Sequence, residues 1–376
     1  MPAVSTVLVV GGGTAGTAAA ILLAEAGIAV DLVELKPDIT ALGSGITLQG
    51  NALRVLRRLG VWEDVQREGH SHNRLTLRAP DADATVLVEL DVERTGGPEL
   101  PATVGMYRPK LARILMDRAV ATGVKVRTST TFAELAQDGT GVTARFTDGS
   151  TGRYDLVIGA DGIRSATRQA VGIDADIKGA GLGAWRAIVP RPASVTHTEL
   201  YYGGPSYISG YCPINDHAMY AYFTEIAQDR MRTVPEEKLA VMRGFAEHYH
   251  GPWDEIRESL TDPSAIHYTW FESHLLDGPW HRGRVLLIGD AAHACPPTLA
   301  QGAAMALEDA QVLTEMLVAA DRVDDELLES FARRRLPRAG AVVEASRQIV
   351  QWTLARDAGD VPALQARISA LVTDPA

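Results

Sequence analysis

The chain has 376 residues, of which 46% are hydrophobic and 22% charged, and its formal net charge is −11. This composition is typical of a folded globular protein, and the negative charge disfavours nucleic acid and anionic membranes as partners. The only two cysteines, Cys212 and Cys295, lack the spacing of a metal site or of a disulfide framework. They indicate the reducing environment of the cytoplasm and predict no metal centre. No apolar stretch approaches the roughly 18 residues that a spanning helix needs, so we expect no membrane segment.

The first 34 residues form a nucleotide-binding pattern. Residues 7–10 are an apolar run typical of a buried parallel strand. A G-x-G-x-x-G turn follows directly, with its glycines at Gly11, Gly13 and Gly16. A helix over 17–27 and a second strand over 28–33 then lead to Glu34. Because the glycines let a pyrophosphate approach the helix start and the acid can accept ribose hydroxyls, we expect a site for FAD or NAD rather than NADP.

Three further elements can be placed before residue 123. Residues 52–59 are predicted to form a helix with Asn51 as its N-cap. Residues 75–92 alternate like a hairpin whose turn lies near Pro80. Residues 108–122 have the apolar spacing of an amphipathic helix.

The composition changes after about residue 180. Residues 180–272 carry eight of the ten tyrosines in short alternating runs, which predicts an antiparallel sheet inserted into an α/β nucleotide-binding domain. The predicted boundaries are 1–72, 101–179 and 273–376 for the nucleotide-binding domain with its C-terminal helices, and 73–100 and 180–272 for the sheet domain.

A second nucleotide signature lies far along the chain. Residues 285–288 read as an apolar strand, and Gly289 and Asp290 form the turn that follows it. A loop stiffened by Pro296 then leads to Gly302, which opens a helix. Two such signatures at distant positions suggest one long cofactor laid across one domain.

With these motifs the chain resembles the FAD-dependent aromatic hydroxylases, which are single-component flavoprotein monooxygenases related to para-hydroxybenzoate hydroxylase. Besides the fingerprint that ends at Glu34, two motifs carry the resemblance: an Asp-Gly motif of Asp161, Gly162, Ser165 and Arg168, and a Gly-Asp motif of Gly289, Asp290, Ala291, Ala292 and His293 with Pro296 and Gly302. Their order and spacing fit the family to about residue 315. The resemblance implies an α/β fold with a Rossmann-like FAD-binding domain and an inserted, mainly antiparallel β-sheet substrate domain, followed by C-terminal helices.

The resemblance also implies how FAD is bound. Asp290 should bind cofactor hydroxyls, the helix that starts at Gly302 should present N–H groups to the flavin pyrimidine edge, and Arg108 should contact the cofactor. The residues expected to bind FAD, non-covalently, are Gly11, Gly13, Thr14, Ala15, Gly16, Glu34, Leu35, Lys36, Gly45, Ile46, Gln49, Arg108, Asp161, Asp290, Gly302, Ala303 and Ala304.

Three positions depart from the family's pattern. Many relatives carry an arginine just before the position of Gly45, whereas residues 35–53 contain none, and Lys36 is the substitute we expect. Ala300 stands where glycine is frequent and Ala304 where asparagine is frequent. The last two changes are mild, because the implied contacts use backbone N–H groups.

The residues that face the substrate are harder to assign. Tyr211 and His217 are the candidates for a base that deprotonates a phenolic substrate. Alternation places Tyr207, Ser209 and Tyr211 on one face of the sheet and Tyr220 and Tyr222 on another, and it does not tell which face lines the pocket. Arg186 is the one obvious arginine near the start of the sheet that could bind an aromatic acid.

Other polar and aromatic residues are given structural roles. His293 is expected to make a hydrogen bond within its loop and Cys295 to pack as a small apolar residue. Glu308 and Asp309 are expected to complement the dipole of their helix. Three tryptophans are expected in the core: Trp185, Trp270 and Trp280.

The function implied by the resemblance is an NAD(P)H- and O2-dependent aromatic hydroxylase that transfers oxygen through a flavin C4a-hydroperoxide. NAD(P)H is expected as a transient co-substrate, with NADH and NADPH both open, because no second fingerprint is present. The substrate is expected to be a small electron-rich aromatic or heteroaromatic molecule, or alternatively a polycyclic, quinolone or antibiotic-like compound. A flavin reductase or halogenase and a non-catalytic FAD-binding protein are the more distant alternatives, and a homodimer is one open assembly.

Overall fold

The computed structural model describes residues 2–38, 44–230 and 232–376. Its first sheet has six strands in the order β18-β19-β12-β1-β2-β8, and every neighbouring pair except β18 and β19 runs parallel. These strands are β1 (Thr6–Val10), β2 (Ala29–Val33), β8 (Lys125–Arg127), β12 (Leu156–Gly159), β18 (His281–Arg282) and β19 (Val285–Leu287). Residues 7–10, 156–159 and 285–287 are buried throughout, as expected for apolar strands that are covered on both faces.

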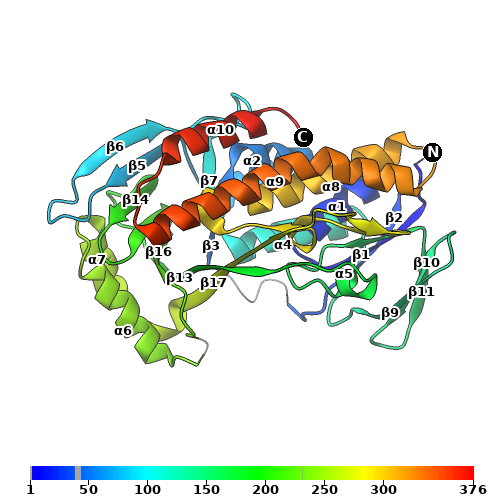
Figure 1. Ribbon diagram of the computed structural model, residues 1–376, viewed down its shortest axis with the longest axis horizontal. Helices are drawn as coiled ribbons and strands as arrows, with labels where there is room; N and C mark the ends of the chain where they lie inside the picture. Colours follow the sequence, from blue (N-terminus) through cyan, green and yellow to red (C-terminus); the bar gives the residue numbers. More distant parts are fainter. Residues whose placement is uncertain (1, 39–43, 231) are drawn as a thin grey trace.

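Helices cover this sheet. The helix α1 (Thr14–Glu25) packs against both α4 (Arg108–Ala121) and α8 (Gly302–Ala319). The long helix α9 (Asp325–Ala355) lies along α8 and also contacts the second sheet, and α10 (Val361–Thr373) packs against α9 (Figure 1). The short helix α5 (Ala166–Ala170) follows β12.

The second sheet has eight strands in the order β20-β17-β13-β16-β15-β14-β5-β6. They are β5 (Arg74–Arg78), β6 (Val86–Asp91), β13 (Lys178–Pro190), β14 (Thr198–Gly203), β15 (Tyr207–Pro213), β16 (Ala218–Ile226), β17 (Ile266–Leu275) and β20 (His293–Ala294). All neighbouring pairs are antiparallel except β14 and β5. On one face, α6 (Pro235–Ala246) and α7 (Pro252–Ser259) cover a core that is rich in aromatic side chains (Figure 1).

Two small sheets complete the fold. One consists of β3 (Gly45–Gln49), β7 (Thr103–Tyr107) and β4 (His70–His72), and β7 contacts β15 of the second sheet. The helices α2 (Gly50–Arg58) and α3 (Trp62–Glu68) connect its strands. The other consists of β9 (Phe132–Gln137), β10 (Val142–Phe146) and β11 (Thr151–Tyr154).

The predicted fold class is confirmed: a mainly parallel sheet with covering helices is joined to a separate, mainly antiparallel sheet. The predicted domain boundaries remain a proposal; β5 pairs with β14, and β6 pairs with β5 at the edge of the same sheet. Trp185 and Trp280 are fully buried as predicted, but the prediction for Trp270 is wrong, since its side chain is 43% exposed and donates to Gln228 O. Within the described ranges, no helix is long and apolar enough to cross a membrane.

Candidate FAD site

The turn between β1 and α1 is shaped by its glycines. Gly11 has a φ of +107°, and a Cβ there would lie 2.4 Å from Ala160 O, so only glycine fits. A Cβ on Gly16 would lie 2.0 Å from Gly11 O, which shows how closely the helix packs on the turn. Gly13 is exposed, and nothing lies within 4 Å of its Cβ position. The backbone is therefore open to a ligand at Gly13.

The first turn of α1 can receive an anion. No side chain caps this helix, and its first residues are Thr14, Ala15 and Gly16. Uncapped N–H groups and the helix dipole favour a phosphate at such an end. These features fit the pyrophosphate of a dinucleotide.

Glu34 lies at the end of β2 beside this turn. Its two carboxylate oxygens accept hydrogen bonds from the backbone N–H groups of Gly12 and Lys36, each at 2.8 Å. Both oxygens retain lone pairs for further donors such as ribose hydroxyls. The side chains of Leu35 and Lys36 are exposed next to it.

The turn that carries Asp290 is held from three sides. Its Gly289 has a φ of +58° and donates its N–H to Asp309 Oδ2 at 2.8 Å. The carbonyl of Asp290 accepts from His274 Nε2 at 2.7 Å, and the carbonyl of Ala291 accepts from Arg168 Nη1 at 2.9 Å. The turn is thus fixed by α8, β17 and α5.

The Asp290 side chain itself is left free for a ligand. It is exposed, yet desolvation by the surrounding protein raises its pKa, while the positive charges of His293 and Arg108 oppose that rise. The two nucleotide signatures meet here, because a Cβ on Gly289 would lie 2.9 Å from the Cβ of Ala15.

Asp161 is used within its own turn. Its carboxylate accepts from Ser165 Oγ and, at 2.8 and 2.9 Å, from the N–H and Oγ1 of Thr167. The preceding Ala160 packs on Gly11. The Asp-Gly motif therefore supports the first glycine turn. Only the lone pairs of the Asp161 carboxylate that these three donors do not use could accept a hydrogen bond from a cofactor.

The start of α8 forms the opposite end of the site. Gly302, Ala303 and Ala304 make its first turn, and no side chain caps it. Ala300, just before it, is in the left-handed region with a φ of +52°, which explains why glycine is frequent at this position. The helix packs against β3, which carries Gly45, Ile46 and Gln49. Arg108 is exposed at the start of α4, near Asp290.

The second sheet closes over β3. The Tyr220 hydroxyl lies 2.5 Å from Thr47 Oγ1, and a Cβ on Gly45 would overlap the Tyr220 ring. Tyr222, two residues along the same strand, is in register with Arg186 on β13. The face that meets β3 is thus the one with Tyr220 and Tyr222, which the sequence could not decide.

The two residues proposed from sequence as bases lie elsewhere. Tyr211 is fully buried on the other face of the sheet, where its hydroxyl donates to Glu199 Oε2 at 2.6 Å and its ring contacts Trp253. His217 is exposed in the turn between β15 and β16. Tyr211 therefore lies on the face away from β3 and His217 in an exposed turn, whereas Tyr220 is the tyrosine that contacts β3, and the assignment of Tyr211 or His217 as the base stays a prediction.

The expected role of Glu308 and Asp309 is wrong. Both are buried and form ion pairs with α9, through Arg335 and Arg338, rather than facing solvent near a helix start. His293 makes the expected structural hydrogen bond, from Nε2 to Asp309 Oδ2 at 2.7 Å. These partners could not be predicted from local pattern, because α9 begins more than a dozen residues later and its register on α8 is a tertiary property.

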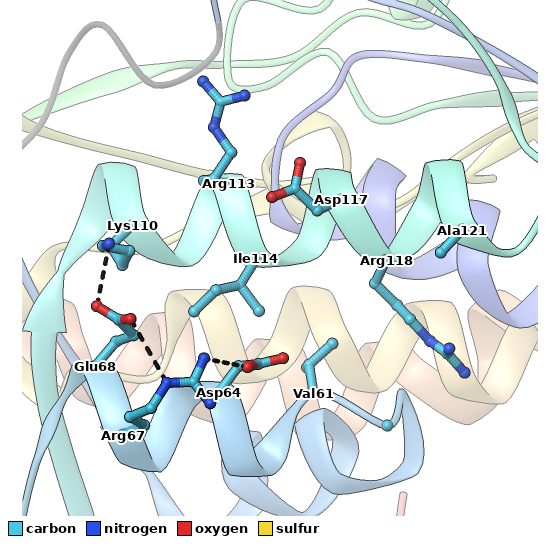
Figure 2. Close-up of a pocket in the computed structure, with 11 residues that line it drawn as sticks. Val61, Asp64, Arg67, Glu68, Lys110, Arg113, Ile114, Asp117, Arg118 and Ala121 are labelled. Carbon is cyan, nitrogen blue, oxygen red and sulfur yellow. Dashed lines mark hydrogen bonds and ion pairs between the residues drawn. The ribbon is translucent and has the colours of Figure 1, made fainter.

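A groove of about 420 Å³ lies between α3 and α4, away from the predicted cofactor residues (Figure 2). Ion pairs cross and flank it, including Lys110 Nζ to Glu68 Oε2 at 3.1 Å and Arg67 with Asp64. None of the residues predicted to bind FAD lines it.

Two glycine turns that meet at Ala15, two uncapped helix starts and the carboxylates of Glu34 and Asp290 are the features of a dinucleotide-binding flavoprotein. The chain matches the family described as FAD binding domain over residues 4–346. It therefore belongs to the family of FAD-dependent aromatic monooxygenases.

Three related proteins illustrate the family. The aurachin C monooxygenase/isomerase of Stigmatella aurantiaca is 30% identical over 92% of this chain and 90% of its own length. The 2-heptyl-3-hydroxy-4(1H)-quinolone synthase of Pseudomonas aeruginosa is 33% identical over 89% and 85%. Among solved structures, a tetrameric form of 2-methyl-3-hydroxypyridine-5-carboxylic acid oxygenase has a TM-score of 0.82 at 27% identity and covers 97% of this chain and 95% of its own.

Proposed function

We propose that this chain uses NAD(P)H and O2 to hydroxylate a small, electron-rich aromatic or heteroaromatic molecule. The observation that carries the proposal is the meeting of three elements at β3: the start of α8, the Asp290 turn nearby, and the Tyr220 face of the second sheet. When bound, FAD supplies the hydride acceptor and the activation of O2.

The residues of the chain would then hold and polarise the cofactor. The start of α1 suits the pyrophosphate, while Glu34 and Asp290 offer acceptors to cofactor hydroxyls. The uncapped start of α8 places partial positive charge where the pyrimidine edge becomes negative on reduction. Loss of water between the second sheet and β3 would strengthen these interactions.

Tyr220 is the residue that we propose to orient the substrate. Burial raises the pKa of Tyr220 above its ordinary value, so the phenol stays protonated at neutral pH. A protonated phenol that accepts from Thr47 can donate its own proton to a substrate oxygen. Its role is positioning by a hydrogen bond rather than removal of a proton.

Arg186 favours an aromatic acid or an anionic oxygen as part of the substrate. It lies in register with Tyr222, on the face that meets β3, and donates to Thr269 Oγ1. A half-buried guanidinium with unused N–H groups suits a carboxylate or an enolate. One relative is named as the synthase of a hydroxyquinolone and one solved structure as the oxygenase of a hydroxypyridine carboxylic acid, so a polycyclic quinolone-like substrate is the second candidate.

The test is substrate-dependent consumption of NADH and NADPH by the purified yellow protein. The panel contains hydroxybenzoates, hydroxypyridine carboxylic acids and hydroxyquinolones, and products are examined for oxygen derived from ¹⁸O2. One class should accelerate consumption and gain one labelled oxygen. If every member leaves the rate at its background value and no product is labelled, the proposal is wrong.

Location and assembly are also proposals. Cys212 and Cys295 are both free thiols, which supports a reducing compartment such as the cytoplasm. The proposed homodimer can be tested by light scattering of the purified protein.

A further inference from the structure

The turn that presents Asp290 depends on a buried carboxylate outside the three motifs. Asp309, on α8, accepts hydrogen bonds at Oδ2 from the N–H of Gly289 at 2.8 Å and from His293 Nε2 at 2.7 Å. Its other oxygen accepts from Arg335 Nε at 2.7 Å. Gly289 and His293 stand on either side of Asp290, so one carboxylate holds both ends of the turn.

The charge on Asp309 is stable. Burial alone would raise its pKa, but the positive charges of His293 and Arg335 and the hydrogen bonds bring the pKa of Asp309 down to about 2. An ionised carboxylate with three donors is a strong anchor, since hydrogen bonds to a charged group exceed neutral ones.

Glu308 provides a natural comparison. It is the adjacent residue on the same helix, and it is equally buried. It pairs with Arg335, Arg338 and Asn51, each at 3.1 Å, and contacts no residue of the 289–293 turn. Glu308 thus ties α8 to α2 and α9, whereas Asp309 ties α8 to the turn.

We infer that Asp309 is a positioning residue of the FAD site, which fixes the Asp290 carboxylate by holding Gly289 and His293 together. Leucine at 309 has nearly the same shape but no acceptor oxygen, so the donors of Gly289 and His293 would both lose their partner. Both ends of the turn would then be released, and Asp290 would lose its fixed direction. Asparagine is less informative, because its one oxygen at the Oδ2 position would keep both bonds to the turn and leave only Arg335 facing the NH2 group.

The experiment compares Asp309→Leu with the matched control Glu308→Leu, both purified as holoenzyme. FAD release after dilution is followed by the rise in flavin fluorescence, and hydrogen exchange is measured in peptides that cover residues 286–296. Asp309→Leu should release FAD at least about tenfold faster and lose amide protection in that segment, because both buried donors of the turn are left without their acceptor. Glu308→Leu should lower the melting temperature but keep the FAD release rate within about twofold of wild type.

Two results would overturn the inference. One is an Asp309→Leu holoenzyme that keeps FAD and the amide protection of the turn as wild type does. The other is an equal acceleration of FAD release in both variants, which would show that Asp309 acts only through general stability.

A third variant covers the case in which Asp309→Leu fails to fold. His293→Leu removes one of the two donors on Asp309 Oδ2 and leaves the α8–α9 ion pairs in place. FAD release should then accelerate several-fold with little change in melting temperature. Wild-type release from this variant would contradict the two-ended anchoring of the turn.

Discussion

Tyr220 and Gly45 are a matched pair, since the tyrosine ring occupies the space that any larger residue at 45 would need. This contact, with the hydrogen bond to Thr47, brings the second sheet onto β3 at one defined point. At the scale of single residues, the function that we propose depends on this contact and on the neighbouring cation, Arg186.

Replacing Tyr220 by phenylalanine should lower kcat/KM by about tenfold, mainly through KM, because one hydrogen bond to the substrate is lost. Tyr211→Phe is the matched control, since Tyr211 lies on the other face of the sheet and donates to Glu199. It should cost stability but leave kcat/KM unchanged. Steady-state kinetics of both variants test this. A large loss of kcat/KM in Tyr211→Phe, with an unchanged kcat/KM in Tyr220→Phe, would contradict the proposal that Tyr220 orients the substrate.

Replacing Arg186 by glutamine should separate the two substrate classes. The KM of an aromatic acid should rise at least about tenfold, since a charge-assisted pair is lost, while the KM of a neutral substrate should change little. Initial rates with a hydroxybenzoate and a hydroxyquinolone measure this difference. Equal changes for both substrates would show that Arg186 does not read the charge of the substrate.

At the scale of elements, local sequence patterns predicted helices, strands and turns, but they did not predict contacts between residues far apart in the chain. The strand, glycine turn and helix of residues 7–25 were predicted from contiguous sequence, because the apolar run, the spaced glycines and the helix follow one another directly, although Gly11 is constrained by Ala160, which directly follows β12. Asn51 was expected as an N-cap, but it lies inside α2 and donates to Gln301 and Glu308. Those partners lie about 250 positions away, where no local pattern indicates them.

The substrate face shows the same limit. Alternation grouped Tyr220 with Tyr222 within one strand, but it is the register of β15 on β16, with Tyr211 opposite Ala221, that places Tyr211 and Tyr220 on opposite faces of the sheet. It could not say which face α6 and α7 would cover. Only the packing of the helices and of β3 on the sheet resolves this.

The start of α8 offers a stability test, because Ala300 adopts a left-handed conformation that costs an alanine about 1 kcal/mol. Ala300→Gly should raise the free energy of unfolding by about 0.5–1 kcal/mol. The control Ala366→Gly changes an exposed, ordinary helical position and should lower it by a similar amount. Denaturant unfolding of the two holoenzyme variants measures these changes in the free energy of unfolding. A lower free energy of unfolding in Ala300→Gly would contradict the claim that the backbone is strained at Ala300.

At the scale of the whole molecule, stability should fall as the pH drops from about 6.5 to about 4. Burial lowers the pKa values of His72 and His274 to about 4, so the unfolded chain binds more protons than the folded one in this window. The contribution of these two neutral histidines to the free energy of unfolding is complete above pH 6.5. It is lost as the pH falls toward 4, because the unfolded chain takes up the protons that the folded chain does not bind. Asp309, with a pKa of about 2, loses its contribution only at lower pH.

Unfolding measured between pH 7.5 and 4 checks this expectation. The double variant His72→Gln, His274→Gln should flatten the slope in that window, because glutamine does not titrate. An unchanged slope would place the acid sensitivity in other groups.

The strand order of the first sheet has a consequence for biosynthesis. β19 lies beside β12, which in turn pairs with β1, although the ribosome completes β1 and β19 nearly 280 codons apart. At about 5–20 residues per second, the early half of the sheet waits many seconds with an unpaired edge. Such late closure makes the nascent chain a client for holding chaperones, and slow translation before the last strand would prolong its exposure to aggregation.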